Sequence, residues 1–234
     1  MQQIFARDSQ SPPGGHRVTD QEAAVKKRIR NPEQTKSRII EFAIEEFTER
    51  GLDGARIDAI AEQSGTNKSL IYKYFNSKED LYTASLARTY EKLRASQHEI
   101  DLDDPDPLVC IEQLVERTFD TFANNPRIVR MLTHENVLNA RFLKETLSVK
   151  LLYTPLLEKM EKVVRSGQEQ GLFRPDIDLK HLYISISALG YFYFSNMHTL
   201  GIVLEKDLAK SDAVATQRRM AVEMTIGYLR KPGA

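Results

Sequence analysis

The sequence predicts an all-α protein in two parts: an N-terminal three-helix domain with a helix-turn-helix, and a larger C-terminal helical domain. Apolar residues recur at helical spacings of three and four after residue 38. Residues typical of helix starts and ends, mainly Asn, Pro and Gly, separate these stretches. The chain contains no strand-like alternation and no internal repeat. Its 234 residues, 41% hydrophobic and 28% charged, are typical of a globular protein.

The first helix is predicted to begin after Asn31 and to end near Gly51. Asn31 is a good N-cap, and Pro32 suits the first helical position. An apolar face follows, formed by residues spaced four apart: Ile39, Ala43 and Phe47. We expect this face to pack against the helix-turn-helix that follows.

The helix-turn-helix is predicted between Ile57 and Phe75, in the segment IDAIAEQSGTNKSLIYKYF. Gly65 follows a short helix over 58–64, at a position that often needs a positive φ. Asn67 is a strong N-cap for the second helix, predicted over 68–75. Two helices joined by a three-residue turn with Gly form this motif.

The second helix of the motif has one apolar face and one face suited to DNA. Ile71 and Phe75, four residues apart, are expected to pack on the first helix. The other face carries hydrogen-bond donors: Lys68, Ser69, Tyr72 and Lys73. A helix N-terminus also attracts phosphate. These features are typical of a recognition helix in the major groove, whereas a solvated polar face is the alternative.

The helices after the motif follow from the same patterns. Ser77 is expected to cap a fourth helix that runs from about Lys78 to Ile100 and joins the two domains. Later helices are predicted over 108–123, 127–139, 142–170, 179–200 and 211–229. Pro155 allows either a kink in one of them or a break with Thr154 as cap.

The segment GTNKSLIYKYFNSKEDLY resembles the signature of the TetR family of bacterial transcriptional repressors. The matching positions run from Gly65 to Phe75 and over Lys78-Glu79-Asp80-Leu81, and the resemblance covers about 35–86. It departs from the family at Arg56 and Ile57, where hydroxyl residues are often found. It also departs at Leu70, which can meet a thymine methyl group.

The resemblance implies domains over 31–78 for DNA binding and over 79–234 for effector binding and dimerisation. In the family, a lysine at the position of Lys78 binds phosphate. The predicted DNA-contacting residues are Arg56, Thr66, Asn67, Lys68, Ser69, Leu70, Tyr72, Lys73, Tyr74 and Lys78.

The predicted basic arm precedes the first helix. The chain has no net charge, so DNA binding requires a local basic patch. Between residues 24 and 38 six basic residues stand against one acidic residue, an excess of five. Residues 1–30 are expected to be disordered. The arm either contacts DNA beside the recognition helix or serves only as a solubilising tail.

The segment from Leu182 to Phe194 is apolar, aromatic or small at nearly every position. A helix that is apolar on all sides must be covered on all sides. The resemblance implies a homodimer in which the last two helices pack against their symmetry mates, and Gly190 is expected to permit close approach. Burial within one large monomeric core is the alternative.

The resemblance also implies a small-molecule effector that binds between helices of the second domain. Polar and aromatic side chains among apolar residues suit such a pocket. The candidates are Tyr90, Phe122, His134, Glu135, Asn136, Phe142, Tyr153, Tyr191, Phe194, Asn196 and His198. The carboxylate of Glu135 is expected to favour a cationic or hydrogen-bond-donating ligand. For any single residue, a satisfied core side chain is the alternative.

Enzyme, cofactor and metal interpretations find no support in the sequence. No Glu-x-x-His pairs, zinc spacing, phosphate loop or nucleophile elbow is present. The single cysteine, Cys110, excludes a disulfide framework within one chain. Neither a secretory h-region nor an apolar stretch of about 20 residues occurs, so a cytoplasmic location without membrane contact is expected.

The sequence therefore predicts a ligand-responsive transcriptional repressor. It would bind a pseudo-palindromic operator of double-stranded DNA as a homodimer and be released by an unidentified small effector. The alternative is a helical ligand-binding or interaction protein without specific operator recognition.

Overall fold

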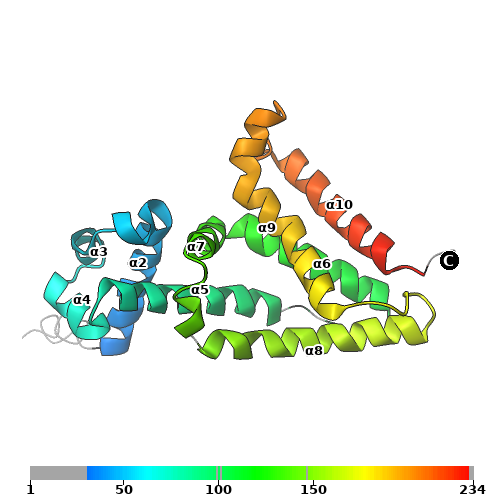
Figure 1. The fold of residues 1–234 in the computed structure, drawn as a ribbon, viewed down its shortest axis with the longest axis horizontal. Coiled ribbons are helices and arrows are strands. Elements are labelled where there is room, and N and C mark those ends of the chain that lie inside the picture. The colour runs from blue at the N-terminus through cyan, green and yellow to red at the C-terminus, as the bar shows by residue number, and fades with distance from the viewer. Residues whose placement is uncertain (1–30, 99, 101, 146, 232–234) are drawn as a thin grey trace, which may run out of the picture. The chain divides into compact units, whose positions relative to one another are not determined.

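The computed structural model describes residues 31–98, 100, 102–145 and 147–231; the side chains of 97, 98, 145 and 147–154 lie outside the description. The predicted basic arm, 1–30, also lies outside the described residues. The described chain is all-helical (Figure 1). Its elements are α2 (Pro32–Gly54), α3 (Ile57–Gln63), α4 (Lys68–Phe75), α5 (Lys78–His98), α6 (Pro107–Asn124), α7 (Pro126–Val137), η1 (Leu143–Glu145), α8 (Leu147–Glu169), α9 (Leu179–Val203) and α10 (Ser211–Leu229). Among these residues there is no strand, only an isolated bridge between Phe173 and Arg230.

Helix α2 begins and breaks where the sequence predicts. Asn31 caps it, because its Oδ1 accepts hydrogen bonds from the backbone N of Glu33 and Gln34 at 3.2 and 3.4 Å. Gly51 breaks the helix with φ 66° and ψ 177°, and a further helical turn ends at Gly54. Such a backbone conformation is almost restricted to glycine.

A first apolar core holds α2 against the helix-turn-helix. Ile39, Ala43 and Phe47 of α2 are fully buried with Ile60 of α3 and Ile71 of α4. The same core continues into α5 and α7, through the buried side chains of Leu81, Tyr82, Leu86, Ile128, Val129 and Met131. The helix-turn-helix therefore shares one core with α5 and α7.

A second core joins α6, α8, α9 and α10. Helix α6 packs against both α9 and α10, and α8 packs against α5, α6 and α9. Arg218 of α10 donates hydrogen bonds from Nε and Nη2 to the two carboxylate oxygens of Asp120 of α6, each at 2.9 Å. This bidentate pair fixes α10 on α6.

Two sequence-based expectations for this domain are decided by the structure. Helix α8 runs through Pro155 as one element, so of the two predicted alternatives the break at Thr154 is wrong. Gly190 is buried against α6 of the same chain, where an added Cβ would lie 3.0 Å from Phe122 Cδ2 and 3.3 Å from Phe119 Cα. Its small size thus serves packing within the subunit, and not approach by a partner helix.

Candidate DNA-binding surface and ligand sites

Helix α4 is set in place by its cap, its turn and its apolar face. Asn67 Oδ1 accepts a hydrogen bond from the backbone N of Leu70 at 2.8 Å, and Gly65 has a φ of 60°. Ile71 and Phe75 are buried at 0% and 4% exposure. The opposite face of the helix is therefore turned to solvent, with its donors exposed: Lys68, Ser69, Tyr72 and Lys73.

The predicted DNA-contacting side chains differ in what they already bind. Lys68 Nζ lies 3.3 Å from Asp58 Oδ2 in an exposed ion pair. A DNA phosphate can take the place of the Asp58 carboxylate in this pair. Lys78 Nζ donates to the backbone carbonyl of Asp53 at 3.1 Å. Thr66 Oγ1 lies 2.8 Å from Ser64 Oγ inside the turn.

The other candidates occupy the start and the flank of the motif. Arg56 precedes α3 and is exposed, and its backbone N donates to Glu46 Oε1 at 3.0 Å. Leu70 and Tyr74 are half-buried. Glu46, which is 3% exposed, was not predicted as a residue that positions the motif. The signal available in the sequence was a carboxylate on the buried face of α2. It anchors the chain where α3 begins.

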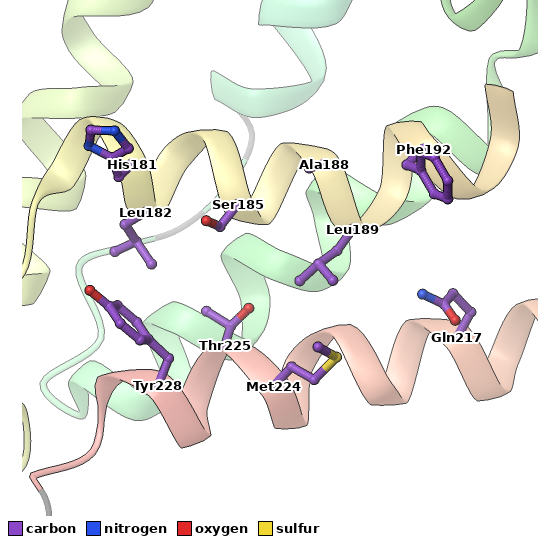
Figure 2. A pocket seen from close by; sticks show the side chains of 10 residues that line it. All are labelled: His181, Leu182, Ser185, Ala188, Leu189, Phe192, Gln217, Met224, Thr225 and Tyr228. Carbon is purple, nitrogen blue, oxygen red and sulfur yellow. The ribbon is translucent and has the colours of Figure 1, made fainter. Parts of the chain in front are cut away.

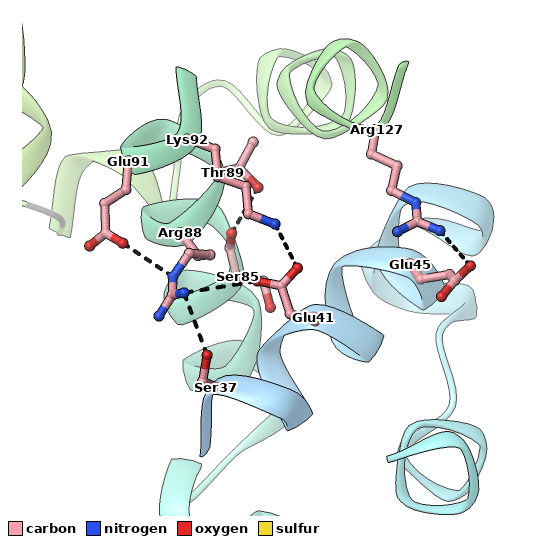
Figure 3. A network of polar contacts seen from close by, with 9 residues as sticks. All are labelled: Ser37, Glu41, Glu45, Ser85, Arg88, Thr89, Glu91, Lys92 and Arg127. Carbon is pink, nitrogen blue, oxygen red and sulfur yellow. Dashed lines mark hydrogen bonds and ion pairs between the residues drawn. The ribbon is translucent and has the colours of Figure 1, made fainter. Parts of the chain in front are cut away.

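Ion pairs join α2 to the second domain (Figure 3). Lys92 Nζ of α5 lies 2.6 Å from Glu41 Oε2, and Arg88 Nη1 lies 3.9 Å from Glu41 Oε1. Arg127 Nη2 at the start of α7 lies 2.7 Å from Glu45 Oε1. Helix α2 is thus tied to both α5 and α7 by opposite charges.

The predicted effector residues fall into two separate places. Tyr90, Glu135 and Phe142 are buried in the interior between α5 and α7. Phe122, His134, Phe194 and His198 instead line an open cavity of about 760 Å³ that also includes Thr48 and Glu49 of α2. Tyr191 adjoins the cavity, because its Oη is 2.9 Å from Oγ1 of Thr133, which lines the cavity.

Two of the remaining predicted effector residues, Asn136 and Asn196, do not line the open cavity themselves. Asn136 is exposed and its Nδ2 donates to the carbonyl of Leu132 at 2.9 Å. Asn196 Nδ2 donates to the carbonyl of Phe192 and to Oγ of Ser195, both at 2.9 Å, and Ser195 lines the cavity. The side chain of Tyr153 lies outside the described residues.

Buried polar groups define the first of these two places, the interior between α5 and α7. Glu135 is 2% exposed, and its Oε1 accepts hydrogen bonds from the backbone N of Phe142 and Leu143, both at 2.9 Å. Burial first, and then the Glu135 charge, raise the pKa of the Tyr82 hydroxyl. Burial likewise raises the pKa of Tyr90 to about 12, with Arg94 acting in the opposite direction.

Two members of this interior, Tyr82 and Arg94, were not predicted from the sequence. Tyr82 and Arg94 share a face of α5 with Tyr90, at spacings of eight and four. Arg94 is 2% exposed, and its Nη2 donates to Tyr183 Oη at 3.1 Å. Ser187 lies on α9 between Tyr183 and Tyr191, again at spacings of four. Polar residues recurring on an otherwise apolar helix face were the available signal.

Helices α9 and α10 together expose a broad apolar face. Ile184 and Phe192 of α9 are each 58% exposed, and Met224 and Tyr228 of α10 are 57% and 46% exposed. A cavity of about 630 Å³ opens between the two helices. Leu182 and Leu189 point across it toward α10 (Figure 2). An exposed apolar patch of this kind marks a contact with another molecule.

Neither a metal cluster nor a membrane span is found in the described part of the chain. It holds no group of three His, Cys, Asp or Glu side chains that could bind a metal ion. None of its helices combines the length and the apolar character that crossing a bilayer requires.

Comparison with known proteins agrees with this arrangement. Residues 39–84 match the family described as "Bacterial regulatory proteins, tetR family", and residues 107–225 match "Tetracyclin repressor-like, C-terminal domain". The chain is 30% identical over 204 residues to the HTH-type transcriptional repressor NicS of Pseudomonas putida, covering 87% of this chain and 96% of that protein. It is 32% identical over 160 residues to the HTH-type transcriptional repressor SCO4008 of Streptomyces coelicolor, covering 68% and 78%.

Solved structures share the fold. The putative transcriptional regulator SCO4942 from Streptomyces coelicolor superposes with a TM-score of 0.65 at 26% identity, over 85% of this chain and 99% of that one. The TetR family regulator PfmR from Thermus thermophilus, at 20% identity, gives a TM-score of 0.61 over 83% and 96%. The chain therefore belongs to the tetR family of bacterial regulatory proteins, which are DNA-binding transcription factors and not enzymes.

Proposed function

We propose that this regulator is a repressor that binds a pseudo-palindromic operator as a homodimer and is released by a small-molecule effector. One observation carries the operator-binding part: α4 is a capped helix whose apolar face is buried and whose donor face is open to solvent. The names of NicS and SCO4008 as repressors support the direction of regulation. An exposed donor face also argues against a protein that has lost operator recognition.

The roles of the DNA-contacting residues follow from their positions. Lys68, Tyr72 and Lys73 would enter the major groove with α4, and Ser69 lies beside them. Leu70 would contact a thymine methyl group at the edge of that face. Lys78 would bind a phosphate at the start of α5 by exchanging its bond to the Asp53 carbonyl.

The domain limits are part of the same proposal. Residues 31–78 would form the DNA-binding domain and residues 79–234 the effector-binding and dimerisation domain. Residues 1–30 would supply additional phosphate contacts through their basic side chains.

The apolar face of α9 and α10 supports dimerisation through these two helices. Phe192, Met224 and Tyr228 would otherwise hold large apolar surfaces in water. A second copy would fill the space between α9 and α10 with its own two helices. Two recognition helices are needed, because one helix reads too few base pairs for useful specificity.

Helices α5 and α7 offer a route from the effector to the DNA. Both contribute to the buried polar interior, and both are ion-paired to α2 through Glu41 and Glu45. A ligand that shifts either helix would therefore move α2 and the motif packed on it. The two recognition helices of the dimer would then no longer match the spacing of the half-sites.

Selection of binding sites from random double-stranded DNA tests the proposal. We expect an enriched sequence with two inverted half-sites, whose centres lie about 10 base pairs or a multiple apart. The Lys68→Ala, Tyr72→Ala double variant provides the control and should enrich no sequence. Failure of the unmodified protein to enrich any sequence would favour a ligand-binding protein without operator recognition.

A further inference from the structure

The open cavity of about 760 Å³ is bordered by α2, the helix that packs against the helix-turn-helix. Thr48 and Glu49 of α2 line it, a few residues before Gly51, where that helix breaks. The remaining lining residues come from α6, α7, α9 and α10 and from the segment just before α10. A molecule held in this cavity would therefore contact α2 and the larger helical domain at the same time.

The cavity has an apolar floor and a polar rim. Phe122 and Val129, which line its floor, are each 4% exposed, and Phe194 beside them is half-buried. The side chains at its rim are exposed to solvent: Glu49, Arg130, Thr133 and His198. A ligand that fits both parts is amphipathic, with an apolar body over the floor and a polar head group at the rim.

The charged and hydrogen-bonding groups of the cavity favour an anionic head group. Arg130 is a permanent cation, and the imidazoles of His134 and His198 can each donate an N–H. Among the described residues that line the cavity, Glu49 is the one carboxylate. Glu135, from which the sequence predicted a cationic ligand, does not line it. The cavity therefore has more donors for an anion than acceptors for a cation.

Arg130 differs from neighbouring cations that are already neutralised. Lys92 is paired with Glu41 at 2.6 Å, and Arg127 is paired with Glu45 at 2.7 Å (Figure 3). Arg130 makes neither an ion pair nor a side-chain hydrogen bond with any residue that the structure describes. A guanidinium presents its N–H donors as a fork that matches the two oxygens of a carboxylate. Arg130 is therefore the lining residue best suited to hold an anionic head group.

The hydroxyl groups of the cavity wall are engaged within the protein. Thr133 Oγ1 lies 2.9 Å from Tyr191 Oη, and Ser195 Oγ accepts from Asn196 Nδ2 at 2.9 Å. Groups that already satisfy one another gain little from a ligand, because each new hydrogen bond replaces an existing one. The choice among polar ligands therefore depends mainly on Arg130.

We propose that this cavity binds a small amphipathic carboxylate, whose carboxylate pairs with Arg130 and whose ring-bearing body covers Phe122 and Phe194. The proposal rests on the proposed function in taking this ligand as the effector, whereas the site itself follows from the cavity and its charges. Because Thr48 and Glu49 form part of the wall, the bound ligand contacts α2 directly and biases its position.

Three probes with one carbon skeleton test the ligand class: cinnamate, cinnamamide and cinnamylamine. Binding to the full-length protein is measured by isothermal titration calorimetry. We expect cinnamate to bind about tenfold more tightly than cinnamamide, and cinnamylamine to bind most weakly. Acetate, which has the head group without the ring, should not bind at millimolar concentration. The proposal is overturned if cinnamate binds no more tightly than cinnamamide, fails to bind at millimolar concentration, or binds no more tightly than acetate.

Arg130→Gln locates the head group. We expect cinnamate to bind about tenfold more weakly to this variant and the affinity for cinnamamide to stay unchanged, because only the charged head group loses its partner. A structural disturbance would weaken both probes alike. Arg117→Gln, at an exposed arginine of α6 that does not line the cavity, is the matched control and should leave both affinities unchanged. An unchanged affinity for cinnamate in Arg130→Gln would contradict the assignment.

Glu49→Gln tests the α2 side of the cavity. The Glu49 carboxylate has the same charge as the proposed ligand, so its removal should strengthen the binding of cinnamate and weaken that of cinnamylamine. If the affinities for both probes stay as they are in the unmodified protein, the ligand does not lie against α2.

Operator binding, measured in parallel, separates this inference from the proposed function. Because coupling between two ligands is reciprocal, an effector bound here must bind more weakly when the operator is present. Cinnamate binding that depends on Arg130 but is the same with and without operator supports the site and removes its role as effector site. If the protein selects no DNA, the repressor proposal fails, while the probes still decide the ligand class.

Discussion

The imidazole of His134 in α7 lies against Gly51, the residue at which α2 breaks. A Cβ placed on Gly51 would be 3.6 Å from His134 Cε1, and His134 Nε2 is 3.4 Å from the carbonyl oxygen of Thr48. Helix α7 therefore contacts α2 at the point just before the chain enters the helix-turn-helix. The same helix carries Glu135 into the polar interior, so one element borders both that interior and the base of the helix-turn-helix.

Replacing Gly51 by Ala should destabilise the fold. Its φ of 66° and ψ of 177° are unfavourable for a residue with a Cβ, although ordinary space exists for the added atom. We expect a loss of about 1–3 kcal/mol in the free energy of unfolding, measured in urea. Gly54→Ala is the control, because Gly54 has no positive φ and its Cβ would meet only Arg50 Cβ at 3.3 Å. Equal losses of unfolding free energy in Gly51→Ala and Gly54→Ala would show that the backbone conformation of Gly51 is not the cause.

The ion pair between Glu45 and Arg127 should matter more for regulation than for stability. Both side chains are partly solvated, so a double-mutant cycle on unfolding with Glu45→Gln and Arg127→Gln should give about 1 kcal/mol or less. The same cycle on operator affinity, with and without effector, should reveal coupling only when ligand is bound. Identical coupling energies in the two conditions would contradict a role for α7 in transmitting the signal.

The DNA contacts should separate into positioning and sequence-reading groups. Lys78→Ala should weaken binding to all DNA and lower the salt slope by about one. Tyr72→Ala should cost more on the selected operator than on random DNA. Lys162→Ala, an exposed lysine on α8, is the control and should change neither quantity. Fluorescence anisotropy at several salt concentrations measures both effects, and equal losses of Tyr72→Ala on both DNAs would remove it from sequence readout.

A charge on the exposed face of α9 should break the dimer without unfolding the subunit. Phe192 is 58% exposed, so Phe192→Glu places its carboxylate in water in the free subunit but against apolar surface in a dimer. Sedimentation velocity should show monomer and the operator affinity should fall. Val137→Glu, at a position on α7 that is 75% exposed, should remain dimeric. A Phe192→Glu protein that stays dimeric would move the interface elsewhere.

Alkaline pH should destabilise the protein through its buried tyrosines. Burial raises the pKa of Tyr90 to about 12 from the ordinary value of 10.0, and that of Tyr82 is raised as well. Above pH 10 the unfolded chain releases protons that the folded chain still holds, so stability falls as pH rises. Urea midpoints from about pH 8 to about pH 11 should decline less in Tyr90→Phe than in the unmodified protein. If the urea midpoints of Tyr90→Phe and of the unmodified protein decline in parallel, the loss of stability at alkaline pH comes from other groups.

The recognition helix and its setting follow from the sequence alone. The cap of Asn67, the turn at Gly65 and the buried pair Ile71 and Phe75 depend on residues close together in the chain. Local hydrogen bonding, the backbone freedom of glycine and helical spacing are sufficient to determine them. For the same reason the helix ends are predicted to within a few residues, and Asn31 caps α2 as expected.

The tertiary structure decided which neighbours those helices meet. The apolar pattern of α9 indicates that another helix covers Gly190, but only the tertiary structure shows that this helix is α6 of the same chain. Helix α8 continues through Pro155, where the local pattern allowed a break as well. Adjacent residues His134 and Glu135 point to different places, an open cavity and a buried interior. These outcomes depend on side chains far apart in the sequence, because burial and hydrogen bonding of α5, α7 and α9 are set jointly when the helices pack.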